Sequence, residues 1–208
     1  MKICICGYTG KTGSKVYELL KDNNYDVYGV DLDNPTIENI KQFDLLIDFT
    51  NKESSLNYIQ QCISNRVDFI VGTTGFLKDE LEKIKYDCQK SNVKGIICYN
   101  FSLPVNYLLN SFRFFNEYFE NFLYFDVHHI SKLDKISGTT NLFSNKNSKI
   151  IVKSIKSKKN TISYIIQMTS KYDKMNITYQ VNDKKAFALG ILYYLKTNNE
   201  DYIENLIG

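Results

Sequence analysis

Residues 1–20 constrain the fold most, because they predict a strand, a tight glycine turn and a helix in direct succession. The run KICIC at residues 2–6 is apolar and suits a buried strand. The segment GYTGKTG at residues 7–13 follows, and apolar residues then recur at helical spacing from Val16 to Leu20. Glycines in such a turn let the backbone approach a pyrophosphate at the helix N-terminus, so the segment is a candidate dinucleotide-binding turn. Its spacing is G-x-x-G-x-x-G, and a glycine turn taken alone often serves packing only.

The second predicted strand, residues 25–30, ends at Asp31. An acid at the tip of this strand can hydrogen-bond the adenosine ribose of a bound dinucleotide. The alternative is an ordinary turn acid, because Asp33, Asn34 and Pro35 form an evident turn directly afterwards. We favour the ribose interpretation of Asp31.

Strand and helix patterns alternate as far as residue 102. This order predicts an α/β fold, with a Rossmann-like dinucleotide-binding domain in which helices cover both faces of a parallel sheet. Ligands bind such sheets beyond the carboxyl ends of the strands, and three polar turns fall at that edge. Taken singly, each turn is an ordinary loop. The three turns contain Asp48-Phe49-Thr50, Gly72-Thr73-Thr74-Gly75 and Tyr99-Asn100-Phe101-Ser102.

The pattern changes at residues 102–104, which mark a boundary and lead into an amphipathic helix with an aromatic stripe. Residues 123–129 predict a strand, and apolar and polar residues alternate between residues 162 and 181, as in an antiparallel or mixed sheet. Residues 184–196 return to a helical pattern, in which Gly190 marks a point of close packing. The second half of the chain therefore predicts a smaller α+β domain with an open mixed sheet.

Charge and cysteine usage exclude several classes of protein. The chain has 26 basic and 23 acidic residues, and apart from residues 156–159 no basic block stands out, so we expect no nucleic-acid partner. The five cysteines are odd in number and lie mostly in apolar runs, as is typical of reduced, buried thiols. Neither a signal peptide nor an apolar run of about 18 residues is evident, so we expect a cytoplasmic protein with no membrane partner.

Residues 127–140, VHHISKLDKISGTT, carry the densest chemistry. They include both histidines of the chain, His128 and His129, and a histidine with its unperturbed pKa of ~6.5 can give or take a proton at neutral pH. Lys132 can act as an acid or as a cationic anchor. The residues Ser137-Gly138-Thr139 are typical of a helix start, where backbone N–H groups accept a carboxylate or phosphate. The segment predicts a pocket for a small anion with proton donors beside it.

Plainer explanations exist for each part of this segment. Adjacent histidines on a strand point to opposite faces unless the backbone bends, and an isolated pair is usually structural. A lysine alone is usually a solvated side chain. We expect no metal site, because the chain has no third histidine and no cysteine lies near in sequence.

The whole pattern H-H-x-x-K-x-D-x-x-S-G-T, which includes Asp134, resembles the substrate loop of the 4-hydroxy-tetrahydrodipicolinate reductase (dihydrodipicolinate reductase) family. The resemblance covers nearly the whole chain in unbroken order. It implies a reductase of diaminopimelate and lysine synthesis that transfers a hydride from a nicotinamide cofactor to a small dicarboxylate. It also implies a homotetramer and a discontinuous dinucleotide-binding domain, residues 1–102 and 183–208, with residues 103–182 as the substrate-binding and oligomerisation domain.

The resemblance implies a role for individual residues. The implied catalytic residues, which transfer a proton, are His128 and Lys132. The implied substrate-binding residues are His129, Ser137, Gly138 and Thr139. Together with Asp31, the expected cofactor-binding residues are Gly7, Tyr8, Thr9, Gly10, Lys11, Thr12, Gly13, Phe49, Thr50, Gly72, Thr73, Thr74, Tyr99, Asn100, Phe101 and Ser102.

Charge near the second strand bears on the cofactor. No arginine or lysine lies between Asp31 and Lys41 to meet the 2′-phosphate of NADPH, although Lys11 can offset part of this lack. We therefore expect NADH to be preferred and NADPH to be usable. The half-apolar sheet predicted at residues ~150–181 must be covered on its open face, which is consistent with the implied tetramer.

The chain departs from the family pattern in several places. It is shorter after Asp33 and between Thr140 and Ile150, Asp126 stands where the family commonly has Glu, and Lys184 stands where Arg is typical. These departures bear on substrate affinity and not on the class of reaction.

Two other functions are kept open: a non-catalytic dinucleotide-binding redox sensor or subunit, and a related reductase that acts on another small carboxylate, because these groups recognise carboxylates and not a whole ring.

Overall fold

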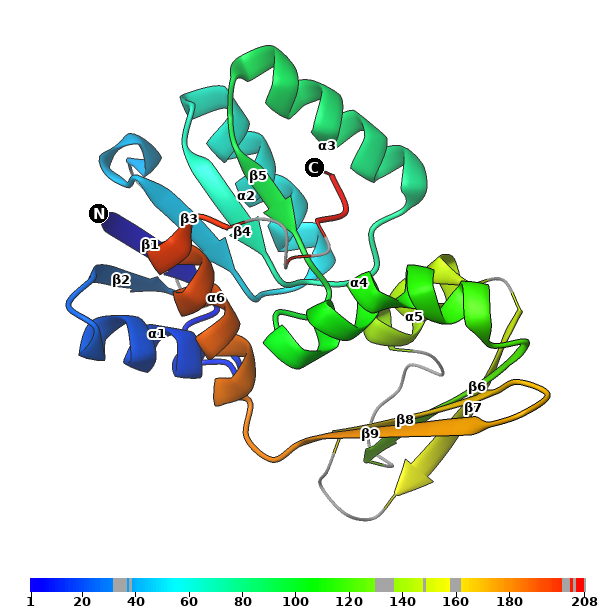
Figure 1. Cartoon of the computed structure of the whole chain (residues 1–208). Helices are drawn as coiled ribbons and strands as arrows, with labels where there is room; N and C mark the ends of the chain where they lie inside the picture. Colours follow the sequence, from blue (N-terminus) through cyan, green and yellow to red (C-terminus); the bar gives the residue numbers. More distant parts are fainter. Residues whose placement is uncertain are drawn as a thin grey trace. The chain divides into compact units, whose positions relative to one another are not determined.

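The computed structural model describes residues 1–31, 37, 39–129, 137–147, 149–157, 162–199, 203 and 205–207, and of His128 and His129 it describes the backbone alone. These residues divide into two compact units, both drawn in Figure 1. Met1–Leu103 and Lys184–Gly208 form the first unit, and Pro104–Asp183 form the second.

The first unit is built on a five-stranded parallel sheet, which confirms the predicted fold class. The strands are β1 (Lys2–Cys6), β2 (Asp26–Val30), β3 (Leu45–Asp48), β4 (Asp68–Val71) and β5 (Gly95–Ile97). They lie in the order β2-β1-β3-β4-β5. The carboxyl ends of β1, β3 and β4 are therefore neighbours at one edge of the sheet.

Helices cover both faces of this sheet (Figure 1). They are α1 (Gly13–Asp22), α2 (Lys52–Asn65), α3 (Lys78–Ser91) and α6 (Lys185–Thr197), with a short 3₁₀ helix, η1, at Ile40–Gln42. Residues of α1 and α6 share one apolar core, and residues of α2 and α3 share the other. The last helix thus belongs to the same unit as the first, although the second unit separates them in sequence.

Strand β1 shows why an unbroken apolar run forms a central strand. Ile3 and Ile5 belong to the core beside α1 and α6, whereas Cys4 and Cys6 belong to the core beside α2 and α3. All four side chains are fully buried. A parallel strand buried on both faces has no solvent side, so polar residues do not alternate along it. Full burial of each isoleucine contributes roughly 1.5–3 kcal/mol.

The C-terminal residues cover the outer edge of β5. The backbone N–H of Leu206 donates to the carbonyl of Ile97 at 2.9 Å. The Asn205 side chain accepts from the N–H of Ile97 and donates to the carbonyl of Gly95, both at 3.1 Å. These bonds satisfy backbone groups that an edge strand otherwise presents for pairing with another chain.

The second unit is built on a four-stranded mixed sheet. Its strands are β6 (Asn121–His129), β7 (Ile150–Ser157), β8 (Ile162–Thr169) and β9 (Lys174–Val181), in the order β7-β6-β8-β9. Strand β6 is parallel to β7 and antiparallel to β8, which is antiparallel to β9. The remaining helices are α4 (Leu103–Tyr118) and α5 (Gly138–Lys146).

Among the residues that the structure describes, helices α4 and α5 cover one face of this mixed sheet. Phe112 of α4 and Phe143 of α5 lie 5.0 Å apart between ring centroids, and Phe143 lies 5.1 Å from Tyr124 of β6. On the other face, Ile151 and Ile155 of β7 are 62% and 43% exposed. Along β8, the buried residues Tyr164, Ile166 and Met168 alternate with half-buried ones, which confirms the alternation predicted for that strand.

Candidate functional site

The turn after β1 requires glycine at specific positions. Gly7 has a φ of +75°, which other residues rarely adopt, and a Cβ atom there would come within 3.0 Å of the carbonyl oxygen of Phe49. A Cβ atom at Gly13 would come within 2.1 Å of the carbonyl oxygen of Gly7. Helix α1 begins at Gly13, and among residues 1–31 no side chain caps its N-terminus, since Thr12 makes no capping hydrogen bond. This bare helix start is suited to a pyrophosphate.

Strand β2 brings Asp31 to the same turn. The N–H of Gly7 donates to the carbonyl of Val30 at 2.8 Å, and the hydroxyl of Thr9 donates to the Asp31 carboxylate. Tyr8 lies against β2 as well, because a Cβ atom at Gly29 would come within 2.4 Å of its ring. The structure therefore places Asp31, Thr9 and Tyr8 together on the β2 side of the turn. Their contact with an adenosine ribose stays a prediction.

Asp48, at the end of β3, organises the neighbouring loops. Its Oδ1 accepts from the N–H of Thr50 at 3.1 Å and from the Thr50 hydroxyl at 2.6 Å. Its Oδ2 accepts from the hydroxyls of Ser55 on α2 and Thr73 after β4, the second at 3.3 Å. Burial raises the pKa of the Asp48 carboxyl, while the hydrogen bonds from Ser55 and Thr50 oppose that rise. Sequence reasoning did not assign a role to Asp48, although a buried acid that ends an apolar strand is a usable signal.

Two aromatic rings, Phe49 and Phe101, pack among the turns that follow β3, β4 and β5. The Phe49 ring lies against Gly72, where a Cβ atom would come within 2.2 Å of it. Phe49 and Phe101 meet edge to face, with ring centroids 6.2 Å apart. The turn that contains Phe101 is held by Asn100, a buried residue whose Oδ1 accepts from the N–H of Ser102 at 2.9 Å. The turns after β3, β4 and β5, which contain expected cofactor-binding residues, therefore pack on one another through these side chains.

A pocket of about 460 Å³ opens at this edge of the sheet. Of the residues that the structure describes, three lysines and no acidic residue line it, so its charge favours a ligand with several negative charges. Asn51, Lys52 and Lys184 were not among the predicted site residues. Several predicted cofactor-binding residues do not line it, namely Gly7, Tyr8, Thr9, Gly10, Gly13, Asp31 and Tyr99–Ser102. The pocket is lined by Lys11, Thr12, Phe49, Thr50, Asn51, Lys52, Gly72, Thr73, Thr74 and Lys184.

Lys52 is held at the pocket by an acid from another helix. Its ammonium lies 2.8 Å from Glu80 of α3, and the same Glu80 oxygen accepts from the N–H of Leu77 at 2.6 Å. These two contacts lower the pKa of Glu80, the bond from Lys52 more than the bond from Leu77. The first turns of α2 and α3 are thereby joined beside the pocket. The sequence offered no signal for a pair 28 residues apart on two helices.

In the second unit, a buried hydrogen-bond network surrounds the start of α5. Ser137 is the N-cap, and its hydroxyl oxygen accepts from the N–H of Thr140 at 3.1 Å. The carboxylate of Asp126 on β6 accepts from the N–H of Ser137 at 3.2 Å and from the Thr140 hydroxyl at 2.5 Å. The Tyr164 hydroxyl donates to the Thr139 hydroxyl at 3.2 Å. The predicted helix start at residues 137–139 is therefore present, with Gly138 and Thr139 in its first turn.

The predicted proton-transfer residues are only partly described. Strand β6 ends at His128 and His129, whose backbones pair with Lys156 and Ser157 of β7. Their side chains lie outside the described residues, and so does Lys132. Their roles therefore stay predictions.

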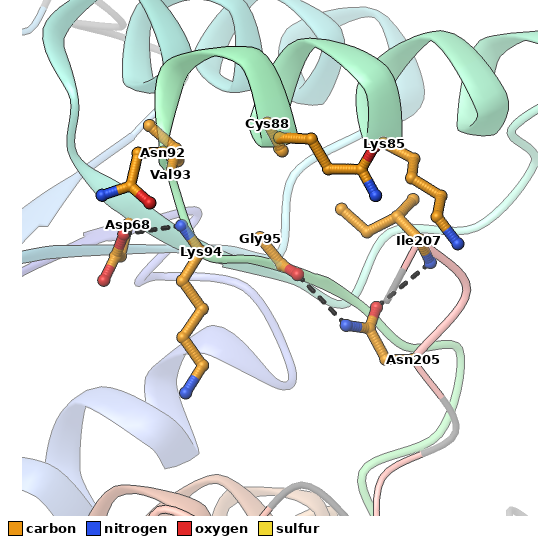
Figure 2. Close-up of a pocket in the computed structure, with 10 residues that line it drawn as sticks. Asp68, Lys85, Cys88, Asn92, Val93, Lys94, Gly95, Asn205 and Ile207 are labelled. Carbon is orange, nitrogen blue, oxygen red and sulfur yellow. Dashed lines mark hydrogen bonds between the residues drawn. The ribbon is translucent and has the colours of Figure 1, made fainter.

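A second pocket, of about 450 Å³, lies at the amino ends of β4 and β5. Figure 2 shows that its polar groups serve local structure: Asp68 accepts from the N–H of Lys94 at 2.8 Å, and Asn205 bridges Gly95 and Ile207. It lies at the edge of the sheet opposite the glycine turn, so it is separate from the lysine-lined pocket.

Cysteines and acids do not form a metal centre within the described part of the chain. No group of three or more histidine, cysteine, aspartate or glutamate residues is placed there to hold an ion. All five cysteines are free and buried, and burial raises the pKa of the Cys88 thiol to about 11. In the same described ranges, no helix is both long and apolar enough to span a bilayer.

Comparison with known proteins identifies relatives along most of the chain. The family described as "Dihydrodipicolinate reductase, N-terminus" matches residues 1–101. A protein of Wigglesworthia glossinidia brevipalpis is 32% identical over 88% of this chain and 72% of its own length. One of Blochmanniella floridana is 30% identical over 70% of this chain but only 65% of its own length. One of Christiangramia forsetii is 26% identical over 94% of this chain and 92% of its own length. All three relatives are named 4-hydroxy-tetrahydrodipicolinate reductase.

A solved structure shares the fold of the whole chain. Dipicolinate-bound dihydrodipicolinate reductase from Paenisporosarcina sp. TG-14 matches with a TM-score of 0.76 over 99% of this chain and 96% of that one. The two sequences are 16% identical. At this level of sequence identity, the match shows that the two proteins share a fold.

Proposed function

Since the chain belongs to the 4-hydroxy-tetrahydrodipicolinate reductase family, a family of oxidoreductases, we propose that it converts 4-hydroxy-tetrahydrodipicolinate to tetrahydrodipicolinate with NAD(P)H. The hydroxyl group leaves as water with a ring hydrogen, and the ring takes up a hydride from the cofactor and one proton. This reaction belongs to diaminopimelate and lysine synthesis, and we place it in the cytoplasm. The observation that carries the proposal is the lysine-lined pocket beside the bare N-terminus of α1. A dinucleotide supplies two phosphates, and this arrangement supplies cations and N–H groups for them.

The residues around this pocket fit a nicotinamide dinucleotide. Glycine at positions 7 and 13 keeps the turn tight, because a side chain at either position would meet backbone atoms of the protein. The turn leads the chain into the N-terminus of α1, where the pyrophosphate binds. Lys11 and Thr12, which belong to this turn, line the pocket. Asp31 takes the adenosine ribose, and Phe49, Thr50, Gly72, Thr73 and Thr74 take the nicotinamide end, beside the turn of residues 99–102. When bound, the cofactor supplies a hydride, and the protein orients it.

The second unit takes the dicarboxylate substrate. One carboxylate binds N–H groups at the start of α5, at Gly138 and Thr139, with Ser137 as the N-cap. His129 contacts the substrate, and His128 and Lys132 transfer the proton that the reduction consumes. The family pattern in residues 128–139 supports these assignments, since all of its members are retained in this chain.

We further propose a homotetramer that covers the open face of the mixed sheet. Ile151 and Ile155 are exposed there on the same face of β7, with Lys153 between them. Exposed apolar patches of this kind usually mark an interaction surface. Light scattering at micromolar concentration tests the proposal, and a monomer would contradict it.

A coupled assay tests the reaction itself. A synthase generates the unstable substrate in place, reduced nicotinamide is added, and loss of its absorbance is followed. Turnover that depends on the synthase supports the proposed function. A folded protein that binds NADH and gives no turnover is instead a dinucleotide-binding sensor or subunit. Turnover with another small carboxylate, and none with this substrate, identifies a related reductase.

A further inference from the structure

The network around α5 determines which backbone groups a carboxylate can reach. The N–H of Ser137 is bonded to Asp126, and the N–H of Thr140 is bonded to the hydroxyl of Ser137. The N–H of Asn141 is bonded to the carbonyl of Ser137. A ligand at this helix start is therefore directed to the N–H groups of Gly138 and Thr139.

Asp126 holds that arrangement from the neighbouring strand. It is fully buried, as is Thr140, and one of its oxygens, Oδ2, accepts both the Ser137 N–H and the Thr140 hydroxyl. The Ser137 and Thr140 hydroxyls lie 2.9 Å apart, which closes a ring of contacts across the first turn. We propose that Asp126 is a positioning residue that sets the first turn of α5 for a substrate carboxylate; the proposal rests on the function proposed above.

The geometry separates the role of the acceptor oxygen from the role of the charge. Because both donors meet the same oxygen, an asparagine at this position can present its carbonyl to both. The negative charge itself lies close to the site of a dianionic substrate and opposes its binding. Loss of the acceptor should therefore weaken substrate binding, whereas loss of the charge alone should not.

The experiment measures KM for substrate and for NADH in three variants, and the dissociation constant of dipicolinate by titration. We expect Asp126→Ala to raise the substrate KM and the dipicolinate constant by ~10-fold or more, with the NADH KM within ~2-fold of wild type. Asp126→Asn should keep substrate KM at or below the wild-type value. Thr140→Val removes one of the two donors without truncating the strand residue, and it should raise substrate KM by ~3- to 10-fold. If Asp126→Ala does not fold, Thr140→Val carries the test.

Asp173→Ala is the matched control. This aspartate lies in the same unit, is exposed, and accepts from Ser170 and Tyr118, away from α5. It should leave both KM values unchanged. Unchanged substrate KM in Thr140→Val and in folded Asp126→Ala would overturn the proposal, as would an Asp126→Asn protein as weak as Asp126→Ala. A wild-type protein with neither turnover nor dipicolinate binding would instead reject the proposed function.

Discussion

Gly190 of α6 packs directly on the backbone of Phe101: a Cβ atom at position 190 would come within 1.7 Å of the Phe101 carbonyl oxygen. The last helix therefore contacts the turn at residues 99–102 that we assign to the nicotinamide end. No rotamer change can relieve such an overlap, because the colliding atom belongs to the main chain.

Gly190→Ala should therefore destabilise the first unit. The helix must shift away from the turn, and overpacking of this kind costs ~1–3 kcal/mol or more. Thermal unfolding measures the effect, and NADH binding should weaken in the same protein. Leu189→Ala on the same helix is the control, since Leu189 is 48% exposed. Equal unfolding temperatures for Gly190→Ala and wild type would show that the two segments are not in contact.

Asp48 gives a prediction about buried hydrogen bonds. Asp48→Leu deprives the N–H of Thr50 and the hydroxyls of Thr50, Ser55 and Thr73 of this acceptor, so we expect a loss of ~2–4 kcal/mol in the free energy of unfolding. Asp48→Asn should cost much less, because its carbonyl can accept from Thr50 while Ser55 and Thr73 accept from its amide. Denaturant titration compares the two variants. A leucine variant as stable as the asparagine variant would contradict the network.

The raised pKa of Asp48 predicts how stability depends on pH. The folded state keeps the Asp48 proton at pH values where the unfolded chain, with a carboxyl pKa of ~3.9, has lost it. The stabilisation that protonated Asp48 contributes is therefore complete below pH ~3.9. It is lost as pH rises through the raised pKa of the folded state. Asp48→Asn should lack this loss. The exposed Asp44→Asn is the control and should keep the wild-type dependence, and an identical pH dependence in all three proteins would reject the prediction.

The sequence predicted those parts of the fold that depend on local pattern. The run KICIC, the glycine turn and the following helix lie where expected, and Gly190 is a point of close packing. The spacing of Leu77, Leu81 and Ile84 in the sequence predicts a helix, and α3 is present there, but Leu77 is its N-cap residue and is 63% exposed. Its N–H is held by Glu80, a contact that apolar periodicity does not record.

The candidate site was predictable wherever the chemistry lies in one turn. The glycines after β1 and the serine that caps α5 each indicate the local backbone conformation by their residue type. Lys52 and Lys184 reach one pocket from distant parts of the chain, and Asn205 reaches β5 from the C-terminal segment. Such contacts depend on the order of the strands in the sheet, and no single local segment of the sequence determines that order.

Lys132 should matter for turnover and not for cofactor binding. Its place three residues beyond the histidine pair, in a segment with few other acids, predicts that Lys132→Ala lowers kcat by ~10²–10⁴-fold, as expected for loss of a general acid. NADH affinity, measured by fluorescence titration, should stay at the wild-type value. Lys135→Ala changes the same charge in the same segment and serves as the control. A near-normal rate in Lys132→Ala would remove this lysine from the mechanism.

Asp31 should set the choice between the two nicotinamide cofactors. Its carboxylate, on the β2 side of the glycine turn, would repel the 2′-phosphate of NADPH by ~1–3 kcal/mol, or about ten- to hundred-fold in kcat/KM. Asp31→Ser should reduce the ratio of kcat/KM for NADH to kcat/KM for NADPH. Asp26→Ser, at the opposite end of the same strand, should leave this ratio unchanged. Measurements at one low salt concentration are needed because screening weakens the effect. A wild-type ratio in favour of NADPH would mean that a cation, such as Lys11, controls this position.

Transfer of label from the cofactor tests the central claim most directly. NADH deuterated at both C4 positions of its nicotinamide ring is supplied with synthase-generated substrate, and the product is analysed by mass spectrometry. We expect each molecule of tetrahydrodipicolinate to carry one deuterium from the cofactor. Formation of this labelled product should be strongly reduced in Lys132→Ala. A folded, NADH-binding protein that forms no labelled product would contradict the proposed function.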